Sequence, residues 1–218
     1  MALARARARA LALVDVGIGN LHSAEKALRR EAPAGLEVAV TSDPEAVRRA
    51  DRIVLPGDGA FPACMDALRA APGLLEALGE AVRVRGVPFL GICVGMQMMA
   101  RAGHEHRTVP GLGWIDAEVR RIAPADGGLK VPHMGWNDLR VARPHPVLEG
   151  IADGDHAYFV HGYAMTPPGG GQLLATCDYG GPLTAVVAEG TAVGAQFHPE
   201  KSQRAGLRLL ANFLRWRP

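Results

Sequence analysis

The sequence predicts an α/β protein: a three-layer fold with a mostly parallel, twisted central sheet and helices on both of its faces. Short apolar runs alternate with segments of helical spacing through the first half of the chain, a pattern typical of parallel strands joined by crossover helices. The second half is a series of short β-like runs followed by one amphipathic helix. No low-complexity linker or internal repeat divides the 218 residues. We therefore expect one domain over residues 11–218, preceded by a disordered extension over residues 1–10.

The first half of the chain is expected to form successive βα units. Apolar runs predict strands over residues 11–16, 36–40, 52–55 and 88–92. The segments between and after them predict helices over residues 21–30, 43–50, 60–70, 74–83 and 94–101. Leu21, Ala24 and Leu28 recur at the spacing that places them on one helical face. Asp43 suits the cap of the second helix and Pro44 its first turn.

The second half is expected to be rich in short strands. Apolar runs separated by Gly, Pro and Asp predict strands over residues 114–122, 137–141, 157–163, 173–178, 183–188 and 192–197. A closing helix is predicted over residues 202–216, because Leu207, Leu210 and Leu214 share one helical face. We expect residues 101–113 and the glycine run 169–171 to be surface insertions.

Composition excludes several classes of protein. With 48% hydrophobic and 21% charged residues the chain is neither disordered nor fibrous. The net charge is +2, and the arginines are scattered along the sequence, whereas a nucleic-acid surface would gather them on one face. No apolar run approaches the ~20 residues of a membrane helix. Three cysteines without regular spacing do not form a disulfide framework, which favours a reducing, cytoplasmic location.

The strongest chemical signal is Cys93, which stands between Gly91 and Gly95 where a predicted strand passes into a predicted helix. A nucleophile in that context forms an elbow, because the glycines allow the sharp turn that lifts the side chain off the end of the sheet. Unpaired N–H groups at a helix start favour the thiolate. The alternative is a buried core cysteine, the usual state of a free thiol. We favour the nucleophile.

A base for Cys93 is predicted at His198, which closes an apolar strand and precedes Pro199 and Glu200. Proline holds the preceding residue extended, and residues two apart in an extended segment face the same side. Glu200 is therefore expected to orient the His198 imidazole, as the third member of a catalytic triad does. The alternative is that Glu200 only complements the dipole of the closing helix.

An oxyanion site is predicted at Gly57, Asp58 and Gly59, which follow Pro56 and a predicted strand. Two glycines in so short a segment let backbone N–H groups turn towards a developing negative charge. A plain β-turn is the alternative, and taken alone this motif favours the turn.

Other candidate sites are weaker. His104, Glu105 and His106 suggest a metal pair, but we expect them in a solvated loop without further ligands. Cys64 and Cys177 lack a glycine elbow and are expected to be inert. The turn around residues 17–19 lacks the third glycine and the Lys-Ser pair of a phosphate loop. We expect no metal and no cofactor.

Several motifs carry a resemblance to a known family. Residues 91–97 (Gly-Ile-Cys-Val-Gly-Met-Gln) and 196–202 (Gln-Phe-His-Pro-Glu-Lys-Ser) resemble the nucleophile and His-Glu motifs of the class I glutamine amidotransferases. Residues 130–137, 158–163 and 15–23 narrow the resemblance to the glutaminase subunits of imidazole glycerol phosphate synthase. The resemblance covers residues 11–217, and it implies the three-layer class I glutamine amidotransferase fold.

The resemblance implies a role for each matching residue. Cys93 would attack glutamine, His198 would transfer protons and Glu200 would orient His198. The backbone of Gly57, Asp58 and Gly59 would flank the substrate amide. The implied glutamine-binding residues are Gln97, Gly162 and Tyr163.

The resemblance also implies a partner, the (β/α)₈ cyclase subunit, in a heterodimer that receives ammonia and makes imidazole glycerol phosphate. Asn20, Met134, Trp136 and Tyr158 would face it. We expect an exposed Trp136, held in a turn by the flanking Gly and Asn. Val16, Asp58 and Gly162 depart from the residues common in the family, although the functions implied at positions 58 and 162 belong to the backbone.

The sequence leaves three other functions open. The chain could serve another synthase, in the vitamin B6 or guanylate pathway, or act as a partner-free Cys-His hydrolase or peptidase. A non-enzymatic regulatory subunit is the third alternative. The motif at residues 132–137 argues against the first, and the intact triad argues against the last.

Overall fold

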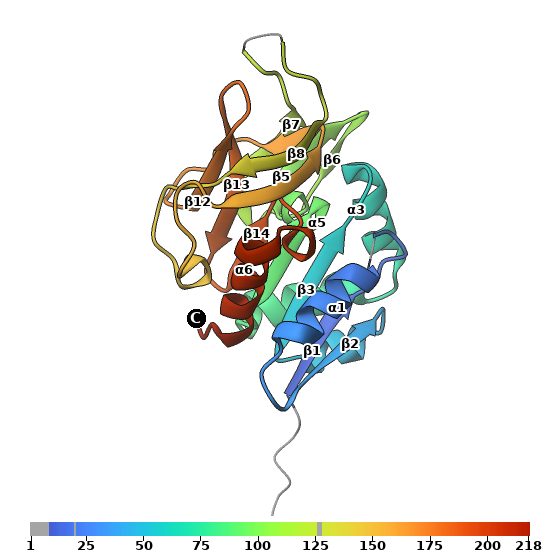
Figure 1. The fold of residues 1–218 in the computed structure, drawn as a ribbon. Coiled ribbons are helices and arrows are strands. Elements are labelled where there is room, and N and C mark those ends of the chain that lie inside the picture. Colours follow the sequence, from blue (N-terminus) through green and yellow to red (C-terminus); the bar gives the residue numbers. More distant parts are fainter. Residues whose placement is uncertain (1–8, 20, 126–127) are drawn as a thin grey trace, which may run out of the picture.

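The computed structural model describes residues 9–19, 21–125 and 128–218. The largest element is an eight-stranded sheet, which contains the strands predicted for the first half of the chain (Figure 1). Its strands, in spatial order, are β2 (Leu36–Thr41), β1 (Arg9–Val14), β3 (Arg52–Gly57), β4 (Phe89–Cys93), β14 (Ala192–Ala195), β13 (Pro182–Glu189), β12 (Leu173–Asp178) and β9 (Arg140–Val141). The first five run parallel and the last three pair antiparallel.

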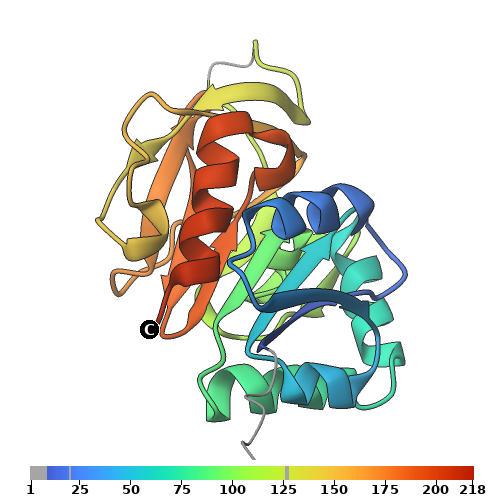
Figure 2. The same cartoon turned by 60° about the horizontal axis from the view of Figure 1, so that its bottom comes forward.

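Helices cover both faces of this sheet, as Figure 2 shows. On one face α1 (Leu21–Glu31) lies beside α6 (Gln203–Arg215). The other face carries α2 (Pro44–Arg49), α3 (Phe61–Ala70) and α4 (Leu74–Gly79), which continues as a π-helical turn over Glu80–Val84. Every residue of β3 and β4 is buried, as expected for parallel strands covered on both sides. The three-layer α/β fold predicted from the sequence is confirmed.

Two smaller sheets stand above one end of the main sheet, at the top of Figure 1. One consists of β11 (Tyr163–Met165), β7 (Ile115–Arg121), β5 (Ala100–Glu105) and β6 (Arg107–Pro110). The other pairs β8 (His133–Asp138) with β10 (His156–His161). Two 3₁₀ turns, Pro146–Leu148 and Pro199–Lys201, and the four-residue helix α5 (Val94–Gln97) complete the elements.

Two of the sequence predictions were wrong around residue 100. The helix predicted over 94–101 ends at Gln97, and residues 101–113 contain the β5–β6 hairpin. The hairpin depends on close approaches that apolar periodicity does not reveal. A Cβ added to Gly103 would lie 2.4 Å from the Phe61 ring, and one added to Gly111 would lie 2.1 Å from the Ala100 carbonyl oxygen. Gly103 allows β5 to pack against α3, and Gly111 allows the segment that follows β6 to pass close to β5.

The predicted extension over residues 1–10 was also too long. Residues 1–8 lie outside the described residues, but Arg9 and Ala10 already pair with β2. Strands pair through their backbones, so these two residues join the sheet although their side chains are polar or small. The apolar pattern of the sequence therefore did not include them. The boundary of the first strand therefore lies two residues before the predicted one.

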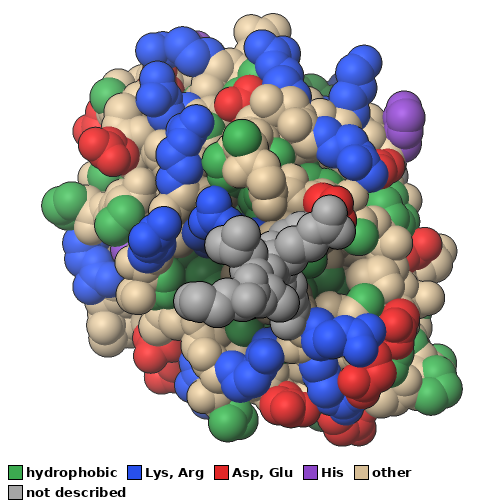
Figure 3. All heavy atoms as spheres, turned by 90° about the horizontal axis from the view of Figure 1, so that it is seen from below, with side chains coloured by type: hydrophobic (Ala, Val, Ile, Leu, Met, Phe, Trp, Pro, Cys, Tyr) green, Lys and Arg blue, Asp and Glu red, His purple; other side chains and the backbone are tan. Residues whose placement is uncertain are grey.

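The core contains few aromatic side chains, because only 5% of the residues are aromatic. The five phenylalanines, Phe61, Phe89, Phe159, Phe197 and Phe213, are all fully buried. Leu, Val, Ile and Ala supply most of the remaining core. On the face seen in Figure 3, Lys and Arg side chains are scattered among acidic and hydrophobic ones. No helix in the described ranges is long and apolar enough to span a membrane.

Candidate active site

Cys93 lies at the end of β4, at the edge where the parallel strands present their carboxyl ends. Its backbone has φ 54° and ψ −113°, a conformation that L-residues rarely adopt. Such strain persists only where the surrounding structure imposes it, and it is often found at functional positions. The predicted sharp elbow at Cys93 is therefore present in the structure.

Three glycines allow this elbow to close against β3. A Cβ added to Gly95 would lie 1.9 Å from the Leu55 carbonyl oxygen, and one added to Gly91 would lie 2.5 Å from the Gly95 carbonyl oxygen. A Cβ added to Gly57 would lie 2.7 Å from the Gly95 nitrogen. Backbone packs directly on backbone here, which only glycine permits. The α5 helix that follows has four residues, so it supplies less dipole than the longer predicted helix.

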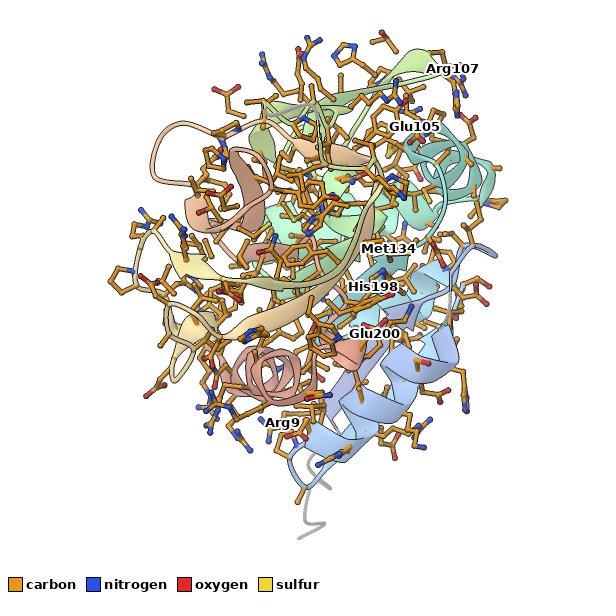
Figure 4. All side chains as sticks on the ribbon, turned by 45° about the horizontal axis from the view of Figure 1, so that its top comes forward. Arg9, Glu105, Arg107, Met134, His198 and Glu200 are labelled. Atoms are coloured by element: carbon orange, nitrogen blue, oxygen red, sulfur yellow. The ribbon has the colours of Figure 1, made fainter. Side chains whose placement is uncertain are left out.

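His198 and Glu200 converge as predicted. The Nδ1 atom of His198 lies 2.8 Å from Glu200 Oε1, and the two side chains are only 7% and 4% exposed. Both residues lie between β14 and α6, where Figure 4 shows them close together. Because the carboxylate only accepts, Nδ1 donates to it and Nε2 is left for the chemistry.

The backbone of His198 is held on both sides. Its N–H donates to the Tyr158 carbonyl oxygen at 3.0 Å. Its carbonyl oxygen accepts from the Ser202 hydroxyl at 2.7 Å, and that hydroxyl in turn accepts from the Tyr158 N–H at 2.9 Å. Strand β10 therefore fixes the position of the imidazole through main-chain contacts.

The electrostatic environment of His198 favours the imidazolium. Burial opposes the charge, but hydrogen bonding and Coulombic attraction from Cys93 and Glu200 outweigh it and raise the pKa of His198 to about 10. No group in the described residues meets hydrogen-bond geometry with His198 Nε2 or Glu200 Oε2. Among these residues His198 Nε2 is therefore without a partner that meets hydrogen-bond geometry, although Cys93 is close enough to raise this pKa. A loose nucleophile–base contact is common before substrate binds.

The predicted oxyanion segment lies beside the nucleophile. Gly57 is the register partner of Cys93 across the β3–β4 pair. The Asp58 side chain is exposed, and its Oδ1 accepts from the Gly59 N–H at 2.9 Å. The Asp58 carbonyl oxygen accepts from the Cys64 thiol at 3.3 Å. The turn is thus held by its own carboxylate on one side and by a buried thiol on the other.

A line of buried amides connects Gln97 to the nucleophile. Gln97 Nε2 donates to the Tyr163 carbonyl oxygen at 2.9 Å and to Gln196 Oε1 at 3.0 Å. Gln196 Nε2 lies 3.8 Å from the Cys93 sulfur. Gly162, the other predicted glutamine-binding residue, directly precedes Tyr163, and its carbonyl oxygen accepts from the Ile122 N–H at 2.9 Å.

Gln196 had no role in the sequence predictions. It is completely buried at the start of the segment that leads to His198. The signal that could have found it is a polar residue directly after an apolar strand and two positions before the candidate base.

The predicted partner face carries exposed apolar side chains on β8. Met134 is 62% exposed and Trp136 is 48% exposed. The Trp136 ring lies edge-on to the ring of the half-buried Tyr158, with 5.8 Å between the two ring centroids. The predicted turn around Trp136 was wrong, because residues 133–138 form a strand whose pairing with β10 the local sequence does not show. Asn20 lies outside the described residues.

The remaining candidates lie away from Cys93. His104 is on β5, not in a loop, and its nitrogens contact Glu118 at 3.0 Å and Thr108 at 3.1 Å. His106 is exposed, 4.0 Å from Glu105. Within the described part of the chain, no three His, Cys, Asp or Glu side chains are placed to hold a metal ion. The structure does not bring these histidines into the site.

The three cysteines are unpaired. Burial raises the pKa of the Cys64 thiol to about 11 and that of the Cys177 thiol to about 12. Both thiols are therefore held in the protonated form, which is unreactive. Cys93 is the cysteine that the fold places at a strained elbow.

Comparisons with known proteins agree on one family. The model of the family described as "Glutamine amidotransferase class-I" matches residues 12–216. Over 208 residues the chain is 63% identical to the imidazole glycerol phosphate synthase subunit HisH of Cereibacter sphaeroides and 59% identical to that of Ruegeria pomeroyi, each match covering 94% of this chain and 98% of the relative. A crystal structure described as a glutamine amidotransferase superposes with a TM-score of 0.70 at 22% identity, covering 93% of this chain and 98% of that one. The last match supports the fold alone.

Proposed function

Because the chain belongs to the class-I glutamine amidotransferase family, we propose that it is the glutaminase subunit of an imidazole glycerol phosphate synthase, in histidine biosynthesis. The observation that carries this proposal is the identity of 63% and 59% to two proteins of that name, over nearly the full length of both. The elbow at Cys93 and the His198–Glu200 contact supply the chemistry that such a subunit needs.

The reaction begins with the Cys93 thiolate attacking the side-chain carbonyl carbon of glutamine. A tetrahedral intermediate forms, and its oxyanion is stabilised by backbone N–H groups beside Gly57 and at the elbow. His198 Nε2 protonates the leaving nitrogen, and the C–N bond breaks to release ammonia. The remaining γ-glutamyl thioester is hydrolysed by a water that His198 deprotonates, which yields glutamate and restores the Cys93 thiolate. Each proton that His198 gives in the first half it recovers in the second.

The electrostatics at His198 suit this cycle. Burial opposes the charge on His198, but the hydrogen bonds and charges of Cys93 and Glu200 raise its pKa to about 10, which favours the imidazolium that protonates the leaving nitrogen. Glu200 holds the Nδ1 hydrogen, so proton transfer takes place at Nε2.

The partner of this subunit is proposed to be the cyclase that receives ammonia, in a heterodimer. The exposed Met134 and Trp136 on β8, with Tyr158 opposite on β10, give that partner an apolar surface on the side of the molecule that carries His198. Asn20, which the resemblance assigns to the partner face, lies outside the described residues. A cytoplasmic location is proposed with it, on the ground that all three cysteines are unpaired.

The test is glutamate release from glutamine, measured with the chain alone and with the cyclase subunit. We expect release in the complex that Cys93→Ala abolishes, while the same variant complex still makes imidazole glycerol phosphate from ammonium salts at high pH. Hydrolysis of glutamine that does not respond to the cyclase, together with no binding between the two chains, would refute the proposed assignment.

A further inference from the structure

Two buried histidines, His133 and His161, have no part in the reaction just described, yet they are hydrogen-bonded to each other and to the glutamine-binding residues. We propose that this pair is a positioning device: it holds the Tyr163 carbonyl, and through that carbonyl the Gln97 amide, in the orientation that receives the substrate. The inference rests on the proposed function, since it concerns the same glutamine site.

The direction of these hydrogen bonds is fixed at the inner end of the series, where His161 contacts Tyr163. His161 Nδ1 lies 2.9 Å from the Tyr163 carbonyl oxygen. A carbonyl only accepts, so Nδ1 carries the hydrogen. The other nitrogen of a neutral His161, Nε2, is then an acceptor, and it lies 3.0 Å from His133 Nδ1. His133 therefore donates to His161, and His161 donates to Tyr163.

The outer end fixes the same direction independently. Asn137 Nδ2 donates to the Asp178 carbonyl oxygen at 2.8 Å, and Asn137 Oδ1 accepts from the Asp138 N–H at 2.8 Å. These two contacts assign the amide orientation, so the atom 3.2 Å from His133 Nε2 is a donor. His133 Nε2 must accept from it, which leaves the hydrogen on Nδ1. Both ends thus require two neutral imidazoles with their hydrogens on Nδ1.

The surroundings of the pair hold both rings in place and neutral. The His133 ring stacks on Phe159, with 4.8 Å between ring centroids, and on Tyr179, with 4.1 Å. His133 and His161 are almost completely buried. Burial lowers the pKa of each to about 4, in agreement with the neutral forms that the hydrogen bonds require.

The chain of contacts ends at the nucleophile. The Tyr163 carbonyl accepts from His161 and also from Gln97 Nε2. Gln97 donates its second amide hydrogen to Gln196, whose own Nε2 lies 3.8 Å from the Cys93 sulfur. A carbonyl with both lone pairs engaged has a defined orientation, whereas loss of the His161 bond would leave a buried acceptor unsatisfied and free to reorient. Gln97 would then lose its fixed partner.

The pair also lies directly beneath the exposed face. His133 is the register partner of His161 in the β8–β10 ribbon, and Trp136 is the register partner of Tyr158. The side chains alternate along β8, so the histidines point inward and the tryptophan points outward. The ribbon is therefore both the support of the glutamine-binding amides and the carrier of the proposed partner face.

The experiment compares His161→Leu with His161→Asn, two substitutions of similar size, in the complex with the cyclase subunit. Asparagine retains a donor near the position of Nδ1, whereas leucine offers none. We expect His161→Leu to raise the KM for glutamine about tenfold with kcat within threefold, and His161→Asn to keep KM within threefold of the parent. Synthesis from ammonium salts should be unchanged in both.

Two further variants complete the test. His133→Phe keeps the stacking between Phe159 and Tyr179 but removes both hydrogen bonds, and it should raise KM several-fold even if His161→Leu does not fold. His145→Phe is the matched control and should leave KM unchanged, because this half-buried histidine lies outside the network, with its ring centroid 5.0 Å from that of Trp216. Equal KM values for the leucine and asparagine variants, or a loss confined to thermal stability, would overturn the inference. Failure of the parent complex to hydrolyse glutamine would instead refute the proposed function.

Discussion

Replacing Trp136 by alanine should weaken binding of the cyclase subunit without unfolding the chain. The indole is 48% exposed, so about half of the ~250 Å² that a tryptophan can bury, roughly 120 Å², is available to a partner. At ~25 cal/mol per Å² its burial contributes about 3 kcal/mol, which corresponds to roughly 150-fold in Kd. Within its own chain the substitution removes the edge contact to Tyr158, worth under ~1 kcal/mol, so Tm should fall by no more than about 4 °C.

The assay is calorimetric titration of the cyclase subunit with each variant, together with a thermal melt of the same preparation. Val84→Ala is the matched control, because Val84 is 80% exposed at the end of the turn that follows α4, away from β8. It should bind like the parent. A Trp136→Ala variant that binds normally but melts far lower would show that Trp136 serves the core, and it would remove the main structural support for the partner face.

Three other predictions concern the active-site segment. Asp58→Val should change kcat/KM for glutamine by less than about tenfold, because the carboxylate is exposed and binds only its own turn; a loss of several hundredfold would show that the side chain takes part. Since the pKa of His198 is raised, its contribution to stability is complete below pH 6.5 and is lost as the pH rises through about 10, so Tm should fall more steeply over that range in the parent than in His198→Asn. Parallel slopes would contradict this. Gly95→Ala places a Cβ 1.9 Å from the Leu55 carbonyl oxygen and should cost at least ~1–3 kcal/mol of unfolding free energy, measured by denaturant titration; an unchanged midpoint would refute the proposed elbow packing.

The sequence predicted those parts of the fold and site that depend on residues close to one another along the chain. The apolar runs located the buried strands of the main sheet within two or three residues at most ends, because burial on both faces leaves a continuous apolar signal. The contact between His198 and Glu200 follows from a proline and a two-residue spacing, and the structure shows it at 2.8 Å. Two of the three glycines that allow the Cys93 elbow, Gly91 and Gly95, are its neighbours in sequence, so the elbow too was visible.

Features that depend on register between distant segments were not visible. The His133–His161 pair exists because β8 and β10 align these positions across 28 residues of sequence. The role of Gln196 depends on a hydrogen bond to Gln97, 99 residues away. The β5–β6 hairpin was missed because its strands have little apolar alternation and depend on the close contacts of Gly103 with Phe61 and of Gly111 with Ala100. Tertiary context decides such contacts, and single-sequence patterns do not contain it.

The central claim is that Cys93 forms a covalent bond with the γ-acyl group of glutamine. The most direct measurement is mass spectrometry of peptides from the complex, quenched with acid during turnover of glutamine. We predict a γ-glutamyl adduct on the peptide that contains Cys93, absent from Cys93→Ala, with the peptides of Cys64 and Cys177 unmodified. An adduct on another residue, or glutamate release by Cys93→Ala at the parental rate, would contradict the account.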